Sequence, residues 1–192
     1  MDKYEQKTLT NVKHVLFCKE KKQIKKIYED AFPKKERMPF VLMVAMSLLL
    51  TTKFFAFYDN ERLCGLIYMA KIGRQAFIMF FAVDEQLRSK GYGAKILGIL
   101  KNKYPNCKIV VSIEPCNESA QNFTLCQRRK NFYLQNGFCD TGYNIKLNGI
   151  NQEILISGGA FRRVTFSVFL IFYSCFAIIP NIRKRVSASE KK

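Results

Sequence analysis

The chain has 192 residues, a length that fits one domain with a short appendage. Hydrophobic residues make up 48% of it, which suffices for a buried core and excludes a chain that is disordered throughout. The formal charge of +17, from 32 Lys and Arg against 15 Asp and Glu, favours polyanionic partners: nucleic acid, an anionic membrane surface or a phosphorylated cofactor. Alternatively, the chain is basic by composition and binds no polyanion other than a cofactor. The net charge alone does not distinguish these possibilities.

The cysteines and the first residues narrow the class further. Seven cysteines are present, an odd number, and no C-x-x-C pair occurs, which disfavours a zinc cluster or a regular disulfide framework. We therefore expect no metal centre, and cysteines that act as small core residues in a reducing cytoplasm. Residues 1–17 lack a long apolar run and predict no signal peptide.

The pattern of apolar residues predicts alternating helices and strands. Helical spacing predicts helices over 20–31, 39–50, 91–104 and 124–136. Apolar and alternating runs predict strands over 53–58, 63–71, 77–83, 107–114, 138–147 and 152–156. Tight turns join the first three strands into an antiparallel meander, and the fourth is continuously apolar, as in a strand buried on both faces. The chain therefore predicts an α/β domain: a mixed central sheet with an antiparallel meander, flanked by about four helices.

The segment from Val83 to Ala94 joins a predicted strand to a predicted helix and carries the first functional signal. Gly91 and Gly93 allow a tight turn and the close approach of a ligand. The helix that begins there offers unpaired backbone N–H groups and the positive end of its dipole, and the neighbouring basic side chains add charge. These features predict a cradle for a pyrophosphate, with a purely structural turn as the alternative.

Two other phosphate-binding loops fit this segment less well. A P-loop requires G-x-x-x-x-G-K-[ST], which the sequence lacks. A dinucleotide fingerprint requires a third glycine where Ile96 stands, although Glu114 lies about 20 residues on, as a ribose-binding acid would. The preceding meander also argues against the dinucleotide interpretation.

Two motifs together resemble one family. Arg88-x-x-Gly91-x-Gly93 is similar to the Q/R-x-x-G-x-G/A acetyl-CoA signature of the GNAT N-acetyltransferases, and residues 132–138 (FYLQNGF) resemble the F/L-Y-x-x-x-G-F helix end of that family. The order of elements between the motifs also matches, and the resemblance extends over about residues 9–158. It implies the GNAT acyl-CoA N-acyltransferase fold and a direct, metal-free transfer of acetyl from acetyl-CoA to a primary amine.

The resemblance also implies roles for individual residues. The backbone of Ala82 and Val83 would pair with the pantetheine arm, and Tyr133 would protonate the leaving thiolate as the general acid. A buried structural aromatic is the alternative for Tyr133. The backbone N–H groups expected to hold the pyrophosphate are those of Arg88, Ser89, Lys90, Gly91, Tyr92, Gly93 and Ala94.

The general base has no motif of its own. Glu114 ends the buried strand, close to where that strand should part from its neighbour at the cofactor, and is our candidate for the base. A surface carboxylate or a salt bridge is its alternative. Asn122 is a candidate hydrogen-bond partner of CoA, and helix capping would explain it equally well. His14, the single histidine, is expected to be structural.

The acceptor and the partners are less defined. The family accepts small-molecule and peptide amines, and no residue selects between them. A non-catalytic protein that binds or senses acyl-CoA is the alternative function for the same fold. Nucleic acid is not an expected partner, because the aromatic residues crowd into apolar strands and the tail instead of alternating with basic residues.

The end of the chain departs from the family pattern. We assign residues 1–160 to the GNAT domain and 161–192 to a hydrophobic, basic tail, in which 164–179 form 16 residues without charge. As a helix this run spans about 24 Å, short of a hydrocarbon core of about 30 Å. Three interpretations compete: packing on the domain or in a homodimer, contact of 164–180 with a membrane, or a degenerate end. The protein would be cytoplasmic, and membrane-associated if the tail anchors it.

Overall fold

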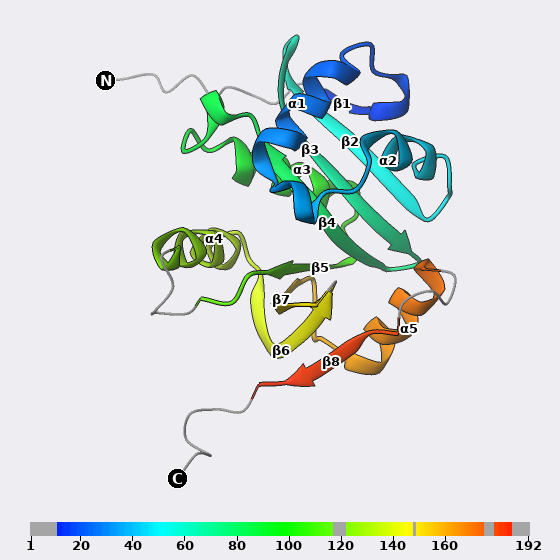
Figure 1. The fold of residues 1–192 in the computed structure, drawn as a ribbon, viewed down its shortest axis with the longest axis vertical. Coiled ribbons are helices and arrows are strands. Elements are labelled where there is room, and N and C mark those ends of the chain that lie inside the picture. The colour runs from blue at the N-terminus through cyan, green and yellow to red at the C-terminus, as the bar shows by residue number, and fades with distance from the viewer. Residues whose placement is uncertain (1–10, 117–121, 148, 175–178, 186–192) are drawn as a thin grey trace. The chain divides into compact units, whose positions relative to one another are not determined.

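A computed structural model describes residues 11–116, 122–147, 149–174 and 179–185. The described residues form eight strands, five α-helices and three short 3-10 helices, and the strands follow the hydrogen-bonded order β1-β2-β3-β4-β5-β7-β6-β8 (Figure 1). The chain divides into two compact units, Met1–Ala70 with Met79–Tyr104 and Lys71–Ile78 with Pro105–Lys192. The expected mixed α/β fold is confirmed, with one α-helix more than the four predicted, because the tail contributes α5.

The first unit is built on the predicted meander. Its strands are β1 (Asn11–His14), β2 (Thr52–Asp59), β3 (Arg62–Ile72) and the second half of β4 (Gln75–Val83). β2 pairs antiparallel with both β1 and β3, so that Ala56 lies opposite Lys13 on one side and Leu66 on the other. Short turns link β2 to β3 and β3 to β4, as the sequence predicts.

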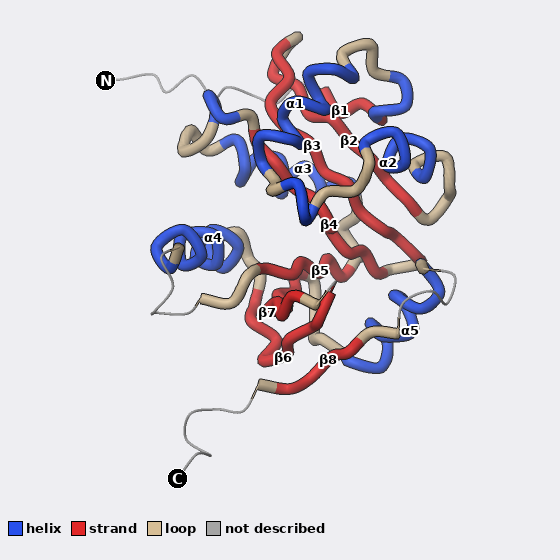
Figure 2. Tube along the Cα trace, viewed as in Figure 1, coloured by secondary structure: helices blue, strands red, loops and turns tan. Residues whose placement is uncertain are grey.

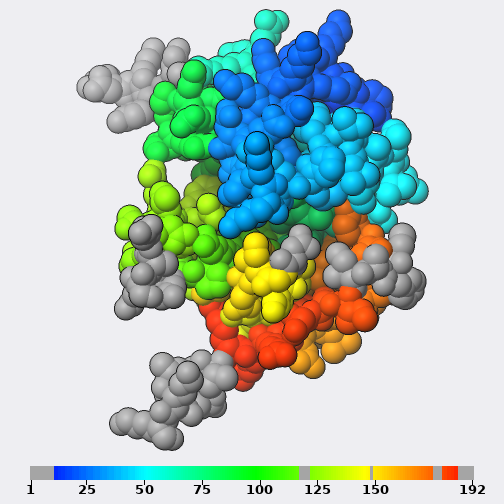
Figure 3. All heavy atoms as spheres, viewed as in Figure 1, coloured from blue at the N-terminus to red at the C-terminus, as the bar shows by residue number. Residues whose placement is uncertain are grey.

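Three helices belong to the first unit: α1 (Lys21–Ala31), α2 (Phe40–Met46) and α3 (Tyr92–Lys103). Figure 3 shows residues of α1 and α2, in shades of blue, on the viewer's side of this unit. Their apolar residues share a core with one face of the strands; Tyr28 is 1% exposed and meets Phe80 edge to face, with ring centroids 5.1 Å apart. The helix predicted over 39–50 ends at Met46, where tight turns lead the chain into β2.

The second unit has a mixed sheet, shown with its helices in Figure 2. Residues Gln75–Ile78 of β4 pair in parallel with the first four residues of β5 (Lys108–Ile113). The remaining strands pair antiparallel and are β7 (Ile150–Ser157), β6 (Cys139–Leu147) and β8 (Asn181–Lys184). The helices are α4 (Phe123–Gln135) and α5 (Arg163–Tyr173).

The tail contributes both a helix and a strand to the second unit. α5 ends at Tyr173, before the predicted end at 179, and residues 175–178 and 186–192 lie outside the described residues. Phe166 of α5 is 1% exposed and packs against Phe77 of β4, with ring centroids 5.5 Å apart. None of the helices in the described part of the chain has the length and apolar character needed to cross a membrane.

Candidate functional site

The loop between β4 and α3 turns through two residues with positive φ. Ser89 has a φ of 63° and Gly91, the N-cap of α3, a φ of 80°. The first hydrogen bond within α3 runs from the Lys95 N–H to the Gly91 carbonyl at 3.2 Å. The N–H groups of Tyr92, Gly93 and Ala94 therefore have no acceptor within the helix, as at any helix start. The N–H groups of Arg88 and Lys90, also predicted to bind the pyrophosphate, instead donate to the Glu85 and Leu87 carbonyls at 3.3 and 3.4 Å. The cradle itself stays a prediction.

The charge next to the start of α3 favours an anion, whereas Asp84 and Glu85 lie at the other end of the loop. Arg88, Ser89 and Lys90 are exposed, and the first turn of α3 contains no acidic residue. The partial positive charge at the start of α3 adds to the two basic side chains. Donors and charge together suit the pyrophosphate of CoA, so the residues present fit the cofactor that the family implies.

The side chain of Tyr92 anchors the loop and does not face a ligand. It is 5% exposed and packs with Cys64 and Leu87, and its hydroxyl donates a 2.6 Å hydrogen bond to the Asp59 carboxylate. That hydrogen bond, with burial as the second cause, raises the pKa of Tyr92 to about 12. Only the backbone N–H of Tyr92 is available to a ligand. Asp59 is a residue that the sequence analysis missed, because no local signal links positions 33 apart.

A glycine fixes the backbone at the end of β4. A Cβ on Gly65 of β3 would lie 2.5 Å from the Ala82 carbonyl oxygen and 3.3 Å from the Val83 Cα. Next to it, the Asp84 N–H donates to the Cys64 carbonyl at 2.9 Å. Gly65 therefore allows the close approach of β3 to the two residues assigned to the pantetheine arm. Sequence reasoning missed Gly65, since a lone glycine in a strand carries no specific signal.

Tyr133 lies in the last turns of α4, in the second unit. The helix ends in a Schellman motif: Gly137 has a φ of 72°, its N–H donates to the Leu134 carbonyl, and the Phe138 N–H donates to the Tyr133 carbonyl at 3.1 Å. The rings of Tyr133 and Phe138 pack edge to face with centroids 5.3 Å apart. Tyr133 is 8% exposed, and burial raises its pKa to about 12 against a smaller opposing effect of Arg129. The phenol is therefore neutral at physiological pH.

Glu114 and Asn122 are brought together at the start of α4. The Glu114 carboxylate accepts a 2.9 Å hydrogen bond from the Asn122 side-chain amide and a 3.4 Å contact from the Cys126 thiol. Burial raises the pKa of Cys126, and the hydrogen bond to Glu114 raises it further, so the thiol keeps its proton. Asn122 does not cap α4 with its side chain; its amide orients Glu114 instead.

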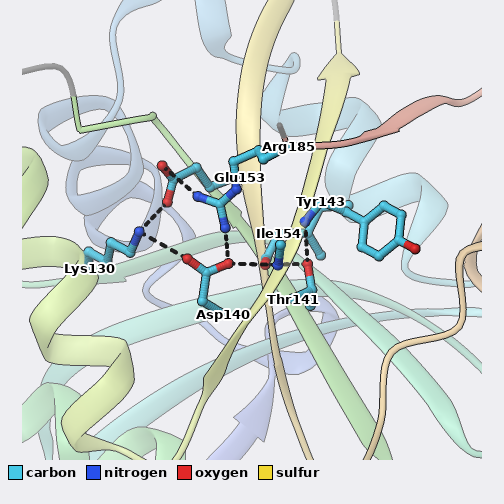
Figure 4. A network of polar contacts seen from close by, with 8 residues as sticks. Lys130, Asp140, Thr141, Tyr143, Glu153, Ile154 and Arg185 are labelled. Atoms are coloured by element: carbon cyan, nitrogen blue, oxygen red, sulfur yellow. Dashed lines mark hydrogen bonds and ion pairs between the residues drawn. The ribbon is translucent and has the colours of Figure 1, made fainter. Parts of the chain in front are cut away.

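Lys130 belongs to a network of ion pairs that joins α4 to the sheet and the tail of the second unit (Figure 4). Its ammonium group lies 3.0 Å from Asp140 and 2.6 Å from Glu153. Arg185 of the tail pairs with the same two carboxylates, and its distance to Glu153 is 2.9 Å. Two cations and two carboxylates from α4, β6, β7 and the tail therefore neutralise one another.

Arg37 follows α1 and has a structural role. The Arg37 guanidinium donates to the carbonyl oxygens of Phe32, at 2.5 Å, and of Glu29. These are carbonyls at the end of α1, where a cation is favourable. Arg37 thus holds the turn after α1 in place.

The comparisons with known proteins agree with the fold and the loop. Residues 21–126 match the model of the acetyltransferase (GNAT) family. No curated protein matches the chain. A GNAT-family protein from Bacteroides thetaiotaomicron is 16% identical, with a TM-score of 0.71 over 88% of this chain and 99% of that one.

Two further solved structures share the fold. An aminoglycoside 6'-N-acetyltransferase complexed with coenzyme A is 13% identical, with a TM-score of 0.60 over 77% of this chain and 96% of that one. The ribosomal-protein-S18-alanine N-acetyltransferase from Escherichia coli is 13% identical, with a TM-score of 0.58 over 79% and 95%. At these identities the likeness concerns the fold alone.

Fold and loop define an acetyltransferase that uses acetyl-CoA. Because the matched residues, 21–126, make up more than half of the chain, the protein belongs to the GNAT acetyltransferase family. The expected enzyme class and cofactor are thereby confirmed: the chain is an N-acetyltransferase, and acetyl-CoA is its cofactor. The match includes the loop 88–94 and Glu114 but ends before Tyr133.

Proposed function

We propose that this protein transfers an acetyl group directly from acetyl-CoA to a primary amine of a small molecule or a peptide. The observation that carries the proposal is the start of α3, where N–H groups without an acceptor in the helix lie beside Arg88 and Lys90. These groups would bind the pyrophosphate, and the backbone of Ala82 and Val83 would pair with the pantetheine arm. When bound, acetyl-CoA supplies an acetyl group activated as a thioester.

Tyr133 is proposed as the general acid. Its pKa of about 12 keeps the phenol protonated, so a proton is available to sulfur as the C–S bond breaks. A thiol has a pKa of about 8.5, so complete transfer from this phenol is less favourable than from an ordinary tyrosine. The hydrogen bond that Tyr133 donates to the developing thiolate would therefore supply much of its effect.

Glu114 is proposed as the general base. Its carboxylate is exposed, and the Asn122 amide holds one of its oxygens. It would accept the proton of the attacking amine directly or through a water molecule, while the amine nitrogen forms its bond to the acetyl carbon. Asn122 is also proposed to contact CoA, a role that competes with its hydrogen bond to Glu114.

A non-catalytic acyl-CoA binding or sensing function is the second candidate. It is favoured by the family match, which ends before Tyr133, and by the two donors that already occupy the Glu114 carboxylate. This candidate predicts acetyl-CoA binding without turnover for any amine.

The remaining partners and the location are also proposals. A homodimer, membrane contact through 164–180 and a cytoplasmic location follow from the sequence alone. α5 buries Phe166, Phe169 and Leu170, which favours packing of this helix within its own unit over insertion into a membrane. The proposed division into a domain, 1–160, and a tail, 161–192, differs from the division into two units, because α5 and β8 belong to the second unit.

The test combines binding with turnover. Acetyl-CoA binding is measured by calorimetry, and the release of free CoA thiol is followed with a panel of amines, including aminoglycosides and peptides with free N-termini. Tyr133→Phe should retain acetyl-CoA affinity and lose turnover by about 100-fold or more, the range for a general acid. Tyr143→Phe is the matched control. Intact binding with no turnover in the wild type would establish the sensing function instead.

A further inference from the structure

A hollow of about 480 Å³ lies in the second unit, where β4 and β5 begin. Gln75 and Lys108, the paired first residues of these parallel strands, form part of its lining, together with α5 and the turn that precedes it. Glu114 follows the opposite end of β5. The hollow is therefore separate from the proposed base, and its residues have no role in the proposed reaction.

One side of the hollow is a wall of aromatic rings that pack on one another. Phe166 and Phe169 are 1% and 6% exposed and stack with ring centroids 5.9 Å apart. Phe161 packs on Phe166 at 5.6 Å. Towards solvent the wall continues with Val168 and Phe172, which are 44% and 60% exposed. Apolar area thus remains open to water at the rim, beside a wall that needs no rearrangement to receive an apolar group.

The polar part of the lining is positively charged. Arg74 and Arg162 are exposed, and neither forms an ion pair with another described residue. Lys108 is half-buried and donates to the Ala160 carbonyl at 3.0 Å. Among the described residues that line the hollow, none is acidic. A cationic ligand would find no counter-charge here.

The start of α5 opens on the same hollow. Its first hydrogen bond runs from the Phe166 N–H to the Arg162 carbonyl at 3.0 Å, so the preceding N–H groups have no acceptor within the helix. No side chain caps this end, and its first turn contains no acidic residue. Thr165, from this turn, lines the hollow. The dipole of the eleven-residue helix thus adds to the charge of the two arginines.

We propose that this hollow binds a small organic anion with an apolar body. Its carboxylate or phosphate would be held by Arg74, Arg162 and the start of α5, and its apolar part would lie against Phe161, Phe166 and Phe172. The volume falls within the range of about 300–1,000 Å³ that is usual for small-molecule sites, and such sites combine apolar walls with a few charged groups.

Decanoate, used below its micelle concentration, is the probe that tests this proposal. Calorimetry should give saturable binding of decanoate, and much weaker binding of decanol and of decyltrimethylammonium, which share its chain but not its charge. The double variant R74Q/R162Q should bind decanoate at least about tenfold more weakly, and Val168→Glu should do the same by placing a like charge at the rim. The variant K34Q/K35Q removes the same charge from exposed residues of the first unit and should bind normally.

Acetyl-CoA affinity should stay unchanged in R74Q/R162Q, which separates this site from the cofactor loop and shows that the variant is folded. The proposal is overturned if decanoate shows no saturable binding, if decanol binds as tightly, or if K34Q/K35Q weakens binding as much as R74Q/R162Q. A parallel titration with vesicles of anionic phospholipid distinguishes the free anion from a lipid surface. Binding to vesicles without binding of decanoate would overturn the small-ligand site in favour of a membrane-binding face.

Discussion

The Tyr92 hydroxyl donates a 2.6 Å hydrogen bond to the Asp59 carboxylate and so joins the first turn of α3 to the turn between β2 and β3. The N–H groups proposed to bind the pyrophosphate belong to that same turn of α3. The buried side chain of Tyr92 therefore fixes the first turn of α3, which contains these backbone N–H donors. The Tyr92–Asp59 hydrogen bond therefore supports the loop proposed to bind the pyrophosphate.

Removal of this hydroxyl should weaken both stability and cofactor binding. Tyr92→Phe leaves the Asp59 carboxylate without its donor, and we expect the free energy of unfolding to fall by about 1–2 kcal/mol. We expect the Kd for acetyl-CoA to rise about fivefold, because the loop loses part of its preorganisation. Urea denaturation and calorimetry measure the two effects. Tyr143→Phe, whose hydroxyl has no hydrogen bond within the described residues, should change neither; equal effects of both variants would refute the anchoring role.

Gly65 should be intolerant of a single methyl group. In Gly65→Ala the new Cβ meets the Ala82 carbonyl oxygen at 2.5 Å, and since the neighbour is backbone, β3 or β4 must shift. We expect a loss of about 1–3 kcal/mol in stability and a clear loss of acetyl-CoA affinity. Gly98→Ala in α3 is the matched control: its Cβ meets nothing within 4 Å, so it should gain about 0.5–1 kcal/mol. Normal acetyl-CoA affinity in Gly65→Ala would show that Gly65 does not support the proposed cofactor site.

The elements that the sequence predicted well are those with local signals. The end of α4 is an example: residues 132–138 resemble a helix-end motif, and there Gly137 adopts a left-handed conformation and Phe138 packs on Tyr133. The meander was equally predictable, because short turns separate its alternating strands. In each case the interacting residues are close in sequence, so composition and spacing contain the information.

The features that escaped prediction depend on distant partners. β1 and β8 are four-residue edge strands, and each pairs with a strand far along the chain. The apolar run after Met46 suggested a longer helix, yet Leu48, Leu49 and Leu50 are exposed, so their pattern reflects no buried face. The ion pairs of Arg185 with β6 and β7 form only once the tail has paired with the sheet.

Glu114 should separate catalysis from binding. The glutamine of Glu114→Gln has the shape of glutamate and can still accept the hydrogen bond from Asn122, but it cannot act as a base. We therefore expect acetyl-CoA affinity to persist and kcat to fall by about 100-fold or more. Glu61→Gln, in an exposed turn, is the control. If Asn122→Ala reproduces the full loss while Glu114→Gln is active, the pair is structural and another base must be sought.

The network of Lys130, Asp140, Glu153 and Arg185 should make stability depend on pH at the acidic end. Burial alone would raise the pKa of Asp140, but the Gly142 N–H, Lys130 and Arg185 outweigh it and lower this pKa. On acidification the unfolded chain therefore takes up its proton first, near the ordinary value of about 3.9, and the folded state loses its advantage as the pH falls further.

Asp140→Asn tests this dependence directly. At pH 7 the variant should be less stable than the wild type by about 1–2 kcal/mol, between the values usual for exposed and buried ion pairs. The difference should persist down to about pH 5 and shrink below about pH 4, because the wild type then loses the charge that the variant lacks. Denaturation curves from pH 3 to 8 measure it. Asp30→Asn, at an exposed position of α1, is the control and should change stability little. If the difference in stability between Asp140→Asn and the wild type stayed constant across this range, the network would stabilise the fold through packing and not through charge.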